Sequence, residues 1–414
     1  MNPKRGAAIW LFLSVLWISS GLNAQTLNLS GYVRNVTGVF TQGDHAYSML
    51  QNTLSLNLEH SRGNVAFKAN PYLYHYSDRD LELGLREAYL DIYFDSIDLR
   101  IGKQQIIWGK ADGVFITDII SPKDLREFLL PDFDEIRIGI TALKADYYLG
   151  NHTVELVWIP AFTPTRMPEE NSIWIVTPDF PIQPTFDYPE KEIKETLENS
   201  EMFAKYSALT SMIDFEIMAG YAWDDDPTLH TAKTMDPITK QVTSLLVTPR
   251  HHRLSLLGGS VSVPAGGFVF RSEGAYYRDK YFQSSDPNLS DGVLKKNYLH
   301  VLLGTDYTLW EVKLSAQFIQ QAILSYDEQI VQDEFENTMT FLASKDFLRE
   351  TLRVEWFSYL GLNHRDALIR PRITYNLADG FEIRTGANIF VGSEGKFGQY
   401  DDNDMVVAKV KYSF

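Results

Sequence analysis

Three arginines near the C-terminal end, Arg370, Arg372 and Arg384, form the group of residues with the clearest chemistry in this sequence. Arg370 and Arg372 lie two residues apart and therefore share one face of a β-strand, while Arg384 falls on a polar position of the next expected strand. A guanidinium presents its N–H donors in a planar fork that binds carboxylates and phosphates. Arg353 shares a strand face with Glu355. This spacing indicates either a row of cations that passes anionic solutes or a set of ion pairs that holds neighbouring strands together.

Other groups with possible chemistry are sparse. The pair His251 and His252 has no third metal ligand nearby in the sequence. The acidic runs 224–226 and 401–404 could hold Ca²⁺ or bridge to lipopolysaccharide, and solvated loop acids are the alternative reading. No Ser/His/Asp order and no paired acids argue for hydrolysis. We therefore expect no enzyme, no catalytic residues, no metal site and no cofactor.

The elements that must position these residues are β-strands. From Leu27 onward apolar and polar residues alternate almost everywhere; Leu54, Leu56 and Leu58, for example, are separated by polar residues. Strands of about ten residues with one apolar and one polar face are typical of transmembrane β-barrels. The sequence predicts an all-β fold, a transmembrane antiparallel barrel of about 18 strands (roughly 16–18), with the polar faces turned inward.

The connections between these strands alternate between short and long. The short ones are 61–64, 95–98, 149–151, 209–212, 264–267, 308–309, 344–348 and 377–380. The long ones are 41–47, 77–81, 108–132, 160–199, 224–249, 282–296, 323–337, 361–365 and 393–403. Short periplasmic turns and long external loops are the pattern of outer-membrane barrels, whereas a soluble sandwich has no reason to gather its long loops at one end.

One stretch, 99–131, departs from this pattern. It begins as an alternating strand, but the alternation stops near Trp108. Ser121 followed by Pro122 predicts the start of a short helix, which Pro131 would end. The apolar face of that helix would consist of Leu125, Phe128 and Leu129.

In a wide barrel such a loop can fold inward and narrow the lumen; the alternative is a loop that packs on the rim. We expect the constriction to be lined by residues from this stretch and from the C-terminal strands. These residues are Lys103, Gln104, Trp108, Lys110, Asp124, Arg353, Arg370, Arg372 and Arg384.

The N-terminus predicts a secretory signal at 1–24, followed by a barrel at 25–414 that forms one domain. Lys4 and Arg5 precede an apolar run at 7–18 and an acceptable cleavage site at 22–24. The chain has 38 Lys+Arg against 54 Asp+Glu, a net charge of −16, which argues against nucleic acid as a partner. It has no Cys, which excludes disulfides. We therefore expect the protein to lie in the outer membrane of a diderm bacterium, and we expect no plug domain before the first strand.

Several short motifs carry a resemblance to a known family. They are IGKQ at 101–104, WG at 108–109, SPKD at 121–124 and the Pro-rich WIPAFTPTRMP at 158–168. Together they resemble the pattern of a large uncharacterised family of outer-membrane porins with a domain of unknown function, distantly similar to alginate-export porins. The resemblance implies a porin-like barrel and no particular substrate. Family members often carry Arg where this chain has Lys103.

The expected function is a porin-like outer-membrane channel for uptake or export of a small hydrophilic or amphipathic solute. The alternative is a non-conducting structural or partner-binding outer-membrane barrel. The expected partners are outer-membrane lipids, lipopolysaccharide, a small solute and the barrel-assembly machinery, and a homo-oligomer is compatible with the sequence. The strand at 406–414 with its final Phe414 resembles the signal that this machinery reads.

Overall fold

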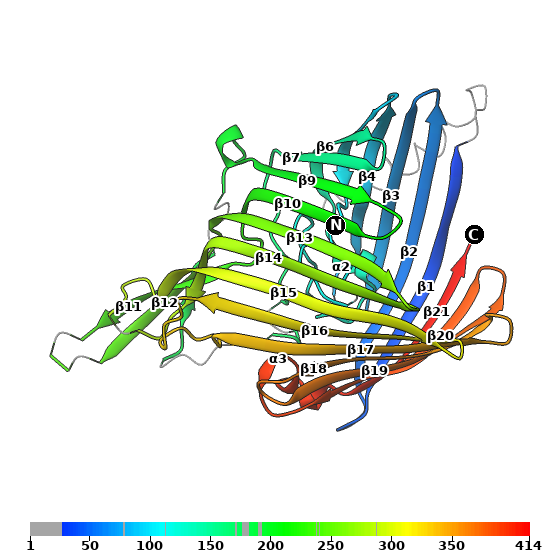
Figure 1. Cartoon of the computed structure of the whole chain (residues 1–414). Helices are drawn as coiled ribbons and strands as arrows, with labels where there is room; N and C mark the ends of the chain where they lie inside the picture. Colours follow the sequence, from blue (N-terminus) through cyan, green and yellow to red (C-terminus); the bar gives the residue numbers. More distant parts are fainter. Residues whose placement is uncertain are drawn as a thin grey trace, which may run out of the picture.

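The structure is a computed structural model that describes residues 27–414 apart from 78, 112, 170–171, 176–181, 189–192, 237, 240 and 287. Eighteen strands form one antiparallel sheet (Figure 1). The sheet closes on itself because β1 (Asn28–Phe40) pairs with both β2 (Tyr47–Arg62) and β21 (Met405–Ser413). The predicted all-β barrel of about 18 strands is confirmed. The predicted signal at 1–24 lies outside the described residues.

The other barrel strands follow in chain order, each paired with its neighbours. They are β3 (Val65–Tyr76), β4 (Glu82–Tyr93), β5 (Ile97–Gln104), β6 (Ile140–Leu149), β7 (His152–Ile159), β9 (Glu201–Leu209), β10 (Asp214–Trp223), β13 (Arg253–Ala265), β14 (Phe268–Gln283), β15 (Val293–Leu309), β16 (Val312–Leu324), β17 (Phe335–Phe347), β18 (Leu352–Gly361), β19 (Asp366–Ala378) and β20 (Phe381–Val391).

The wall of the barrel is polar inside and apolar outside. In β2 the polar side chains Gln51, Thr53 and Ser55 are buried in the interior. Apolar side chains on the opposite strand faces are open, as for Leu257, which is 57 % exposed, and Leu303, which is 61 % exposed. Because side chains alternate between the two faces, a register slip of one residue would turn this whole pattern inside out, so the alternation fixes the register.

The connections alternate as the sequence predicts. One end of the barrel carries the short turns 63–64, 94–96, 150–151, 210–213, 266–267, 310–311, 348–351 and 379–380. The other end carries 41–46, 77–81, 105–139, 160–200, 224–252, 284–292, 325–334, 362–365 and 392–404. By analogy with other barrels we call this second end external.

The long connections contain some regular structure of their own. A hairpin of β11 (Thr228–Met235) and β12 (Val242–Arg250) projects beyond the barrel strands, and β8 (Thr185–Phe186) pairs in parallel with β12 (Figure 1). The sequence predicted only a loop there. Within the described residues the helices are α2 (Phe133–Ile136), α3 (Gly395–Gly398), η2 (Leu197–Asn199) and η3 (Asp401–Asn403). In the described part of the chain, no helix has the length and apolar character needed to cross a membrane.

The prediction of a helix between Ser121 and Pro131 was wrong. Residues 122–124 are extended and run beside 136–138, with Asp124 N–H donating to the Ile136 carbonyl at 2.6 Å. A turn follows in which Phe128 adopts a positive φ of 52°, and the short helix α2 comes after Pro131 instead of before it. The Ser121 hydroxyl bonds the N–H and the carbonyl of Ile106, so it is not free to cap a helix.

Candidate functional site: the lumen and its inward segment

The connection between β5 and β6, residues 105–139, folds into the barrel; we call it the inward segment. Glu273 of β14, which is 4 % exposed, accepts hydrogen bonds from the N–H groups of Lys110 and Thr117, both at 3.0 Å. On another part of the wall, Tyr359 of β18 donates to the Gly113 carbonyl at 2.5 Å. The inward segment is thus held from several strands at once, which confirms that this loop enters the lumen.

The Trp-Gly pair of the sequence motif fastens the start of the inward segment. Trp108 is 1 % exposed and its indole N–H donates to Glu155 of β7. Gly109 has a φ of +91°, and a Cβ added there would lie 2.4 Å from Glu273 Oε1. Glycine is required because the backbone has both a left-handed conformation and a close carboxylate neighbour.

The motifs at 121–124 and 158–168 meet in space. Asp124 forms an isolated parallel bridge with Arg166, and its carboxylate lies 3.6 Å from the Arg166 guanidinium. Arg126 binds the same carboxylate at 2.6 Å and Glu82 of β4 at 3.0 Å. The Pro-rich connection therefore braces the inward segment against the wall.

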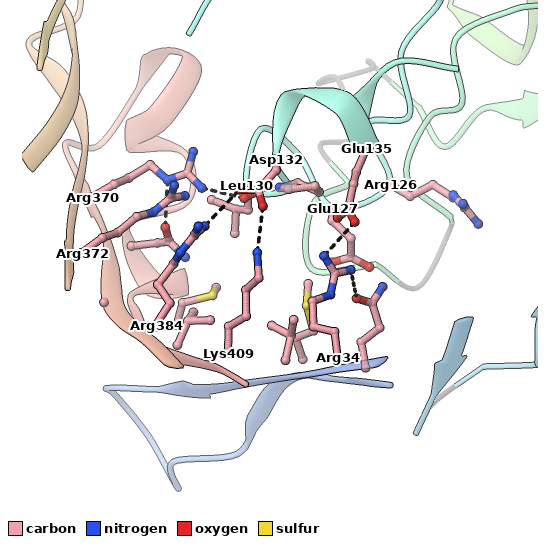
Figure 2. Close-up of a pocket in the computed structure, with 18 of the residues that line it drawn as sticks. Arg34, Arg126, Glu127, Leu130, Asp132, Glu135, Arg370, Arg372, Arg384 and Lys409 are labelled. Carbon is pink, nitrogen blue, oxygen red and sulfur yellow. Dashed lines mark hydrogen bonds and ion pairs between the residues drawn. The ribbon is translucent and has the colours of Figure 1, made fainter. Parts of the chain in front are cut away.

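A row of cations on adjacent strands faces the inward segment (Figure 2). We call these five residues the cation belt: Arg34 of β1, Arg370 and Arg372 of β19, Arg384 of β20 and Lys409 of β21. Two acids of the inward segment bind the belt. Glu135 pairs with Arg34 at 2.7 Å, and Asp132 pairs with Lys409 at 2.9 Å and with Arg384 at 3.2 Å.

Arg370 binds backbone instead of an acid. Its Nη1 and Nη2 donate to the carbonyls of Leu129 and Leu130 at 2.9 and 2.6 Å, and its Nε donates to Asn388 at 3.1 Å. Burial favours raising the pKa of Asp132, but the charges of Lys409 and Arg384 hold it below its usual range. Asp132 is consequently ionised at neutral pH.

Two cavities lie on opposite faces of the inward segment. The first, of about 130 Å³, lies beside the cation belt, and we call it the basic cavity. The second, of about 610 Å³, is bordered by external connections at 224–229 and 332–333, and we call it the outer cavity. Asp124, Arg126 and Glu127 line the basic cavity, whereas the interleaved residues Lys123 and Leu125 line the outer one. Residues 123–130 thus form a partition one chain thick.

An aromatic cluster fixes this partition. Phe128 stacks on Trp174 of the Pro-rich connection, with 5.7 Å between ring centroids, and contacts Phe390 of β20 at 6.2 Å. Phe397 and Tyr400 of the connection 392–404 join the same cluster. Three external connections therefore meet at Phe128.

The structure brings together four of the predicted site residues: Asp124, Arg370, Arg372 and Arg384 all line the basic cavity. The other five lie elsewhere. Gln104 is fully buried and its side-chain amide donates to the Ala142 carbonyl of β6, within the wall itself. Trp108 is buried and fastens the inward segment to Glu155 of β7. Neither residue lines a cavity.

Lys103, Lys110 and Arg353 also lie away from both cavities. Lys103 is paired with Ala88 and Thr141 on the strand face opposite to Gln104, because side chains alternate. The backbone of Lys110 binds the wall: its N–H donates to Glu273, and its carbonyl accepts a hydrogen bond from Arg271. Arg353 is half exposed beside the turn 348–351 and pairs with Asp346 at 2.7 Å.

Sequence reasoning missed three residues that the geometry makes central: Lys409, Asp132 and Glu273. Lys409 could have been found, because it continues the polar face of the last strand beside Arg384. Asp132 and Glu273 could not, since their partners are far away in the chain and no local pattern marks them.

The histidine pair 251–252 and the acidic runs 224–226 and 401–404 show no metal site in the structure. Among the residues that the structure describes, no group of three or more His, Asp or Glu side chains could hold a metal ion. His252 lies with its Nε2 2.8 Å from Nε2 of His230 and stacks on Tyr281, whereas His251 bonds the Asp224 carbonyl.

Residues 35–343 match a family described as a protein of unknown function, DUF1302. The chain belongs to this family. The resemblance seen in the motifs is thereby confirmed at the level of the family, while the distant similarity to alginate-export porins stays a prediction. A comparison with curated protein sequences finds no match.

Solved barrels share the fold. OccK8 (OprE) of Pseudomonas aeruginosa is 10% identical with a TM-score of 0.56, covering 94% of this chain and 98% of that one. OpdL of Pseudomonas aeruginosa is 11% identical with a TM-score of 0.56, covering 94% and 99%. OccAB3 of Acinetobacter baumannii is 10% identical with a TM-score of 0.52, covering 94% and 100%. At these identities the likeness concerns the fold alone.

Proposed function

We propose that this chain is a porin-like channel of the outer membrane of a diderm bacterium, exported by a signal at 1–24, and that it passes a small hydrophilic or amphipathic solute. One observation carries the proposal: a closed 18-stranded barrel with an apolar outer wall has a polar interior that the inward segment narrows without filling. Barrels of this size leave an aqueous space unless a loop occupies it. The structural neighbours are outer-membrane porins, which supports the same class.

The test is the conductance of the purified, folded protein in planar lipid bilayers. We expect discrete steps in concentrated KCl. A heat-modifiable shift on gels and recovery with the outer-membrane fraction should accompany them. Absence of steps above the lipid background would contradict the channel, and recovery of the mature chain from the soluble periplasm would contradict the location.

A second candidate is a non-conducting barrel that binds a partner or serves as a scaffold. The observation in its favour is the close packing inside the lumen, where Trp108, Ile116 and Phe397 are fully buried. The same bilayer experiment separates the two, because a scaffold with a sealed lumen gives no steps. The expectation that the protein is not an enzyme stays a prediction.

A further inference from the structure

The carboxylate of Asp132 occupies a binding place built by the barrel wall. Lys409 Nζ at 2.9 Å and Arg384 Nη1 at 3.2 Å hold it, and both belong to the cation belt (Figure 2). The two cation side chains are largely enclosed, at 11% and 26% exposure. Charge-assisted hydrogen bonds in such partly dry surroundings are about twice as strong as neutral ones. The wall thus binds one carboxylate that the inward segment supplies.

The residues before Asp132 give this carboxylate an apolar body. Leu130 and Pro131 line the basic cavity next to it. The facing wall supplies apolar side chains from three strands: Val36 of β1, Met49 of β2, and Met405 and Val407 of β21. The tripeptide 130–132 therefore fills its part of the cavity with a small apolar group attached to one negative charge. An amphipathic anion from solution would present the same surface.

Arg372 adds an unused donor to this place. It lines the basic cavity with 23% of its side chain exposed, and its nearest carboxylate oxygen, on Glu355, lies 3.9 Å away. In the described part of the chain its guanidinium donates no hydrogen bond. Arg370, by contrast, is fully engaged with the carbonyls of Leu129 and Leu130 and with Asn388.

The acids of the wall limit how much negative charge the cavity can accept. Glu382 lies 3.5 Å from the Arg384 guanidinium, and Glu355 stands beside Arg372. With these two acids in place, exchanging Asp132 for one external carboxylate keeps the local charge unchanged. A cationic solute would face the belt itself, and a neutral solute could not replace Asp132.

We propose that the basic cavity binds small amphipathic monocarboxylates, with the carboxylate on Arg372, Arg384 and Lys409 in place of Asp132 and the apolar body where Leu130 and Pro131 now lie. The proposal rests on the proposed channel function and names the class of its solute. Asp132 acts as an internal competitor: the segment's carboxylate leaves the belt as the solute's carboxylate arrives, so binding and movement of the inward segment are coupled.

The experiment is isothermal titration calorimetry of the full, folded chain in detergent micelles. Phenylacetate is the probe; acetate lacks the apolar body and phenylacetamide lacks the charge. We expect measurable binding of phenylacetate, with acetate and phenylacetamide at least about tenfold weaker, since each loses one of the two recognised features.

Three variants locate the site. Asp132→Asn weakens the internal competitor and should tighten phenylacetate binding about tenfold, while Arg372→Gln should weaken it about tenfold. Arg353→Gln, the same change on a strand face outside the basic cavity, should leave binding unchanged. Heat-modifiable gel migration verifies that each barrel is folded.

Equal binding of phenylacetate and phenylacetamide, no binding of phenylacetate, or an Asp132→Asn protein that binds no tighter than the parent would each overturn the proposal. Conductance in KCl alone, with no organic solute, tests the channel separately. A conducting barrel that binds no phenylacetate refutes only the solute class. A barrel that binds it with the expected order of variants but never conducts refutes only the channel.

Discussion

Gly109 shows how one small residue decides whether the inward segment can dock. A Cβ there would lie 2.4 Å from Oε1 of Glu273 and 2.8 Å from the Thr117 hydroxyl, on a backbone with φ +91°. The Glu273 carboxylate is buried and satisfied by the inward segment, so it cannot move away without losing these bonds.

We expect Gly109→Ala to cost about 1–3 kcal/mol of docking free energy. The measurement is hydrogen exchange by mass spectrometry, which should show faster exchange across 105–139 with the barrel strands unchanged. Gly150→Ala is the matched control, because Gly150 also has a positive φ, of 62°, but no atom within 4 Å of an added Cβ. Equal effects of the two changes on 105–139 would show that the contact with Glu273 is unimportant.

The stability of the docked inward segment depends on pH through Asp132, and the direction of this dependence follows from the pKa of its carboxyl group. Burial opposes ionisation, but Lys409 and Arg384 bring the pKa below the usual value of 3.8. A carboxyl whose folded pKa is lowered contributes stability that is fully present above the unfolded pKa and is lost as pH falls through the folded one.

After correction for intrinsic rates, the amide hydrogens across 105–139 should therefore be equally protected from exchange at pH 7 and pH 5. They should lose protection only below about pH 4. Asp132→Asn should remove most of this change while keeping the shape of the side chain. A loss of protection between pH 7 and pH 5 would show that another group controls the docking.

At the level of elements, we expect the inward segment to narrow the lumen, because it lies between the two cavities. Replacing residues 113–129 by a short Gly-Ser linker removes Phe128 from its aromatic cluster and joins the two cavities. We expect larger single-channel conductance in planar bilayers. Shortening the tip 236–241 of the β11–β12 hairpin, which projects beyond the barrel, should leave conductance unchanged. Equal conductance of the 113–129 variant and the parent, in folded barrels, would place the narrow point elsewhere.

The strands could be predicted from sequence because each one carries its own evidence, an apolar and a polar face with period two. The grouping of Arg370, Arg372 and Arg384 followed from the same alternation. The path of the inward segment could not be predicted, since tertiary contacts decide it. The Ser121 hydroxyl serves Ile106 in place of a helix end, and Glu273 binds the segment from more than 150 residues away.

On the scale of the whole molecule, acidic side chains of the external connections lie apart from the cation belt. Acids of the external connections border the outer cavity, among them Asp224, Asp225 and Asp333. The belt lies on the other face of the partition at residues 123–130. An acidic protein with a net charge of −16 can thus present cations inside its lumen, beside the basic cavity.

This arrangement predicts a selectivity that changes with salt. Charges at the mouth are screened beyond roughly 8–10 Å at physiological ionic strength, whereas charges beside a narrow path act at short range. Reversal potentials in KCl gradients should show a cation preference at low salt that weakens as salt rises, with an anion preference emerging. Arg372→Glu should shift the potentials toward cations at every salt concentration. Arg370 is unsuitable for this test because it also holds the carbonyls of Leu129 and Leu130.

Arg353→Glu is the control for that shift, because Arg353 is half exposed beside the turn 348–351 and lines neither cavity. Its effect on the reversal potential should be smaller and should vanish at high salt, as expected for a screened charge near the barrel end. Arg372 is enclosed beside the path and should keep its effect there. If Arg372→Glu left the reversal potential unchanged while conductance persisted, ions would have to pass the partition without meeting the cation belt, by a route on the side of the outer cavity.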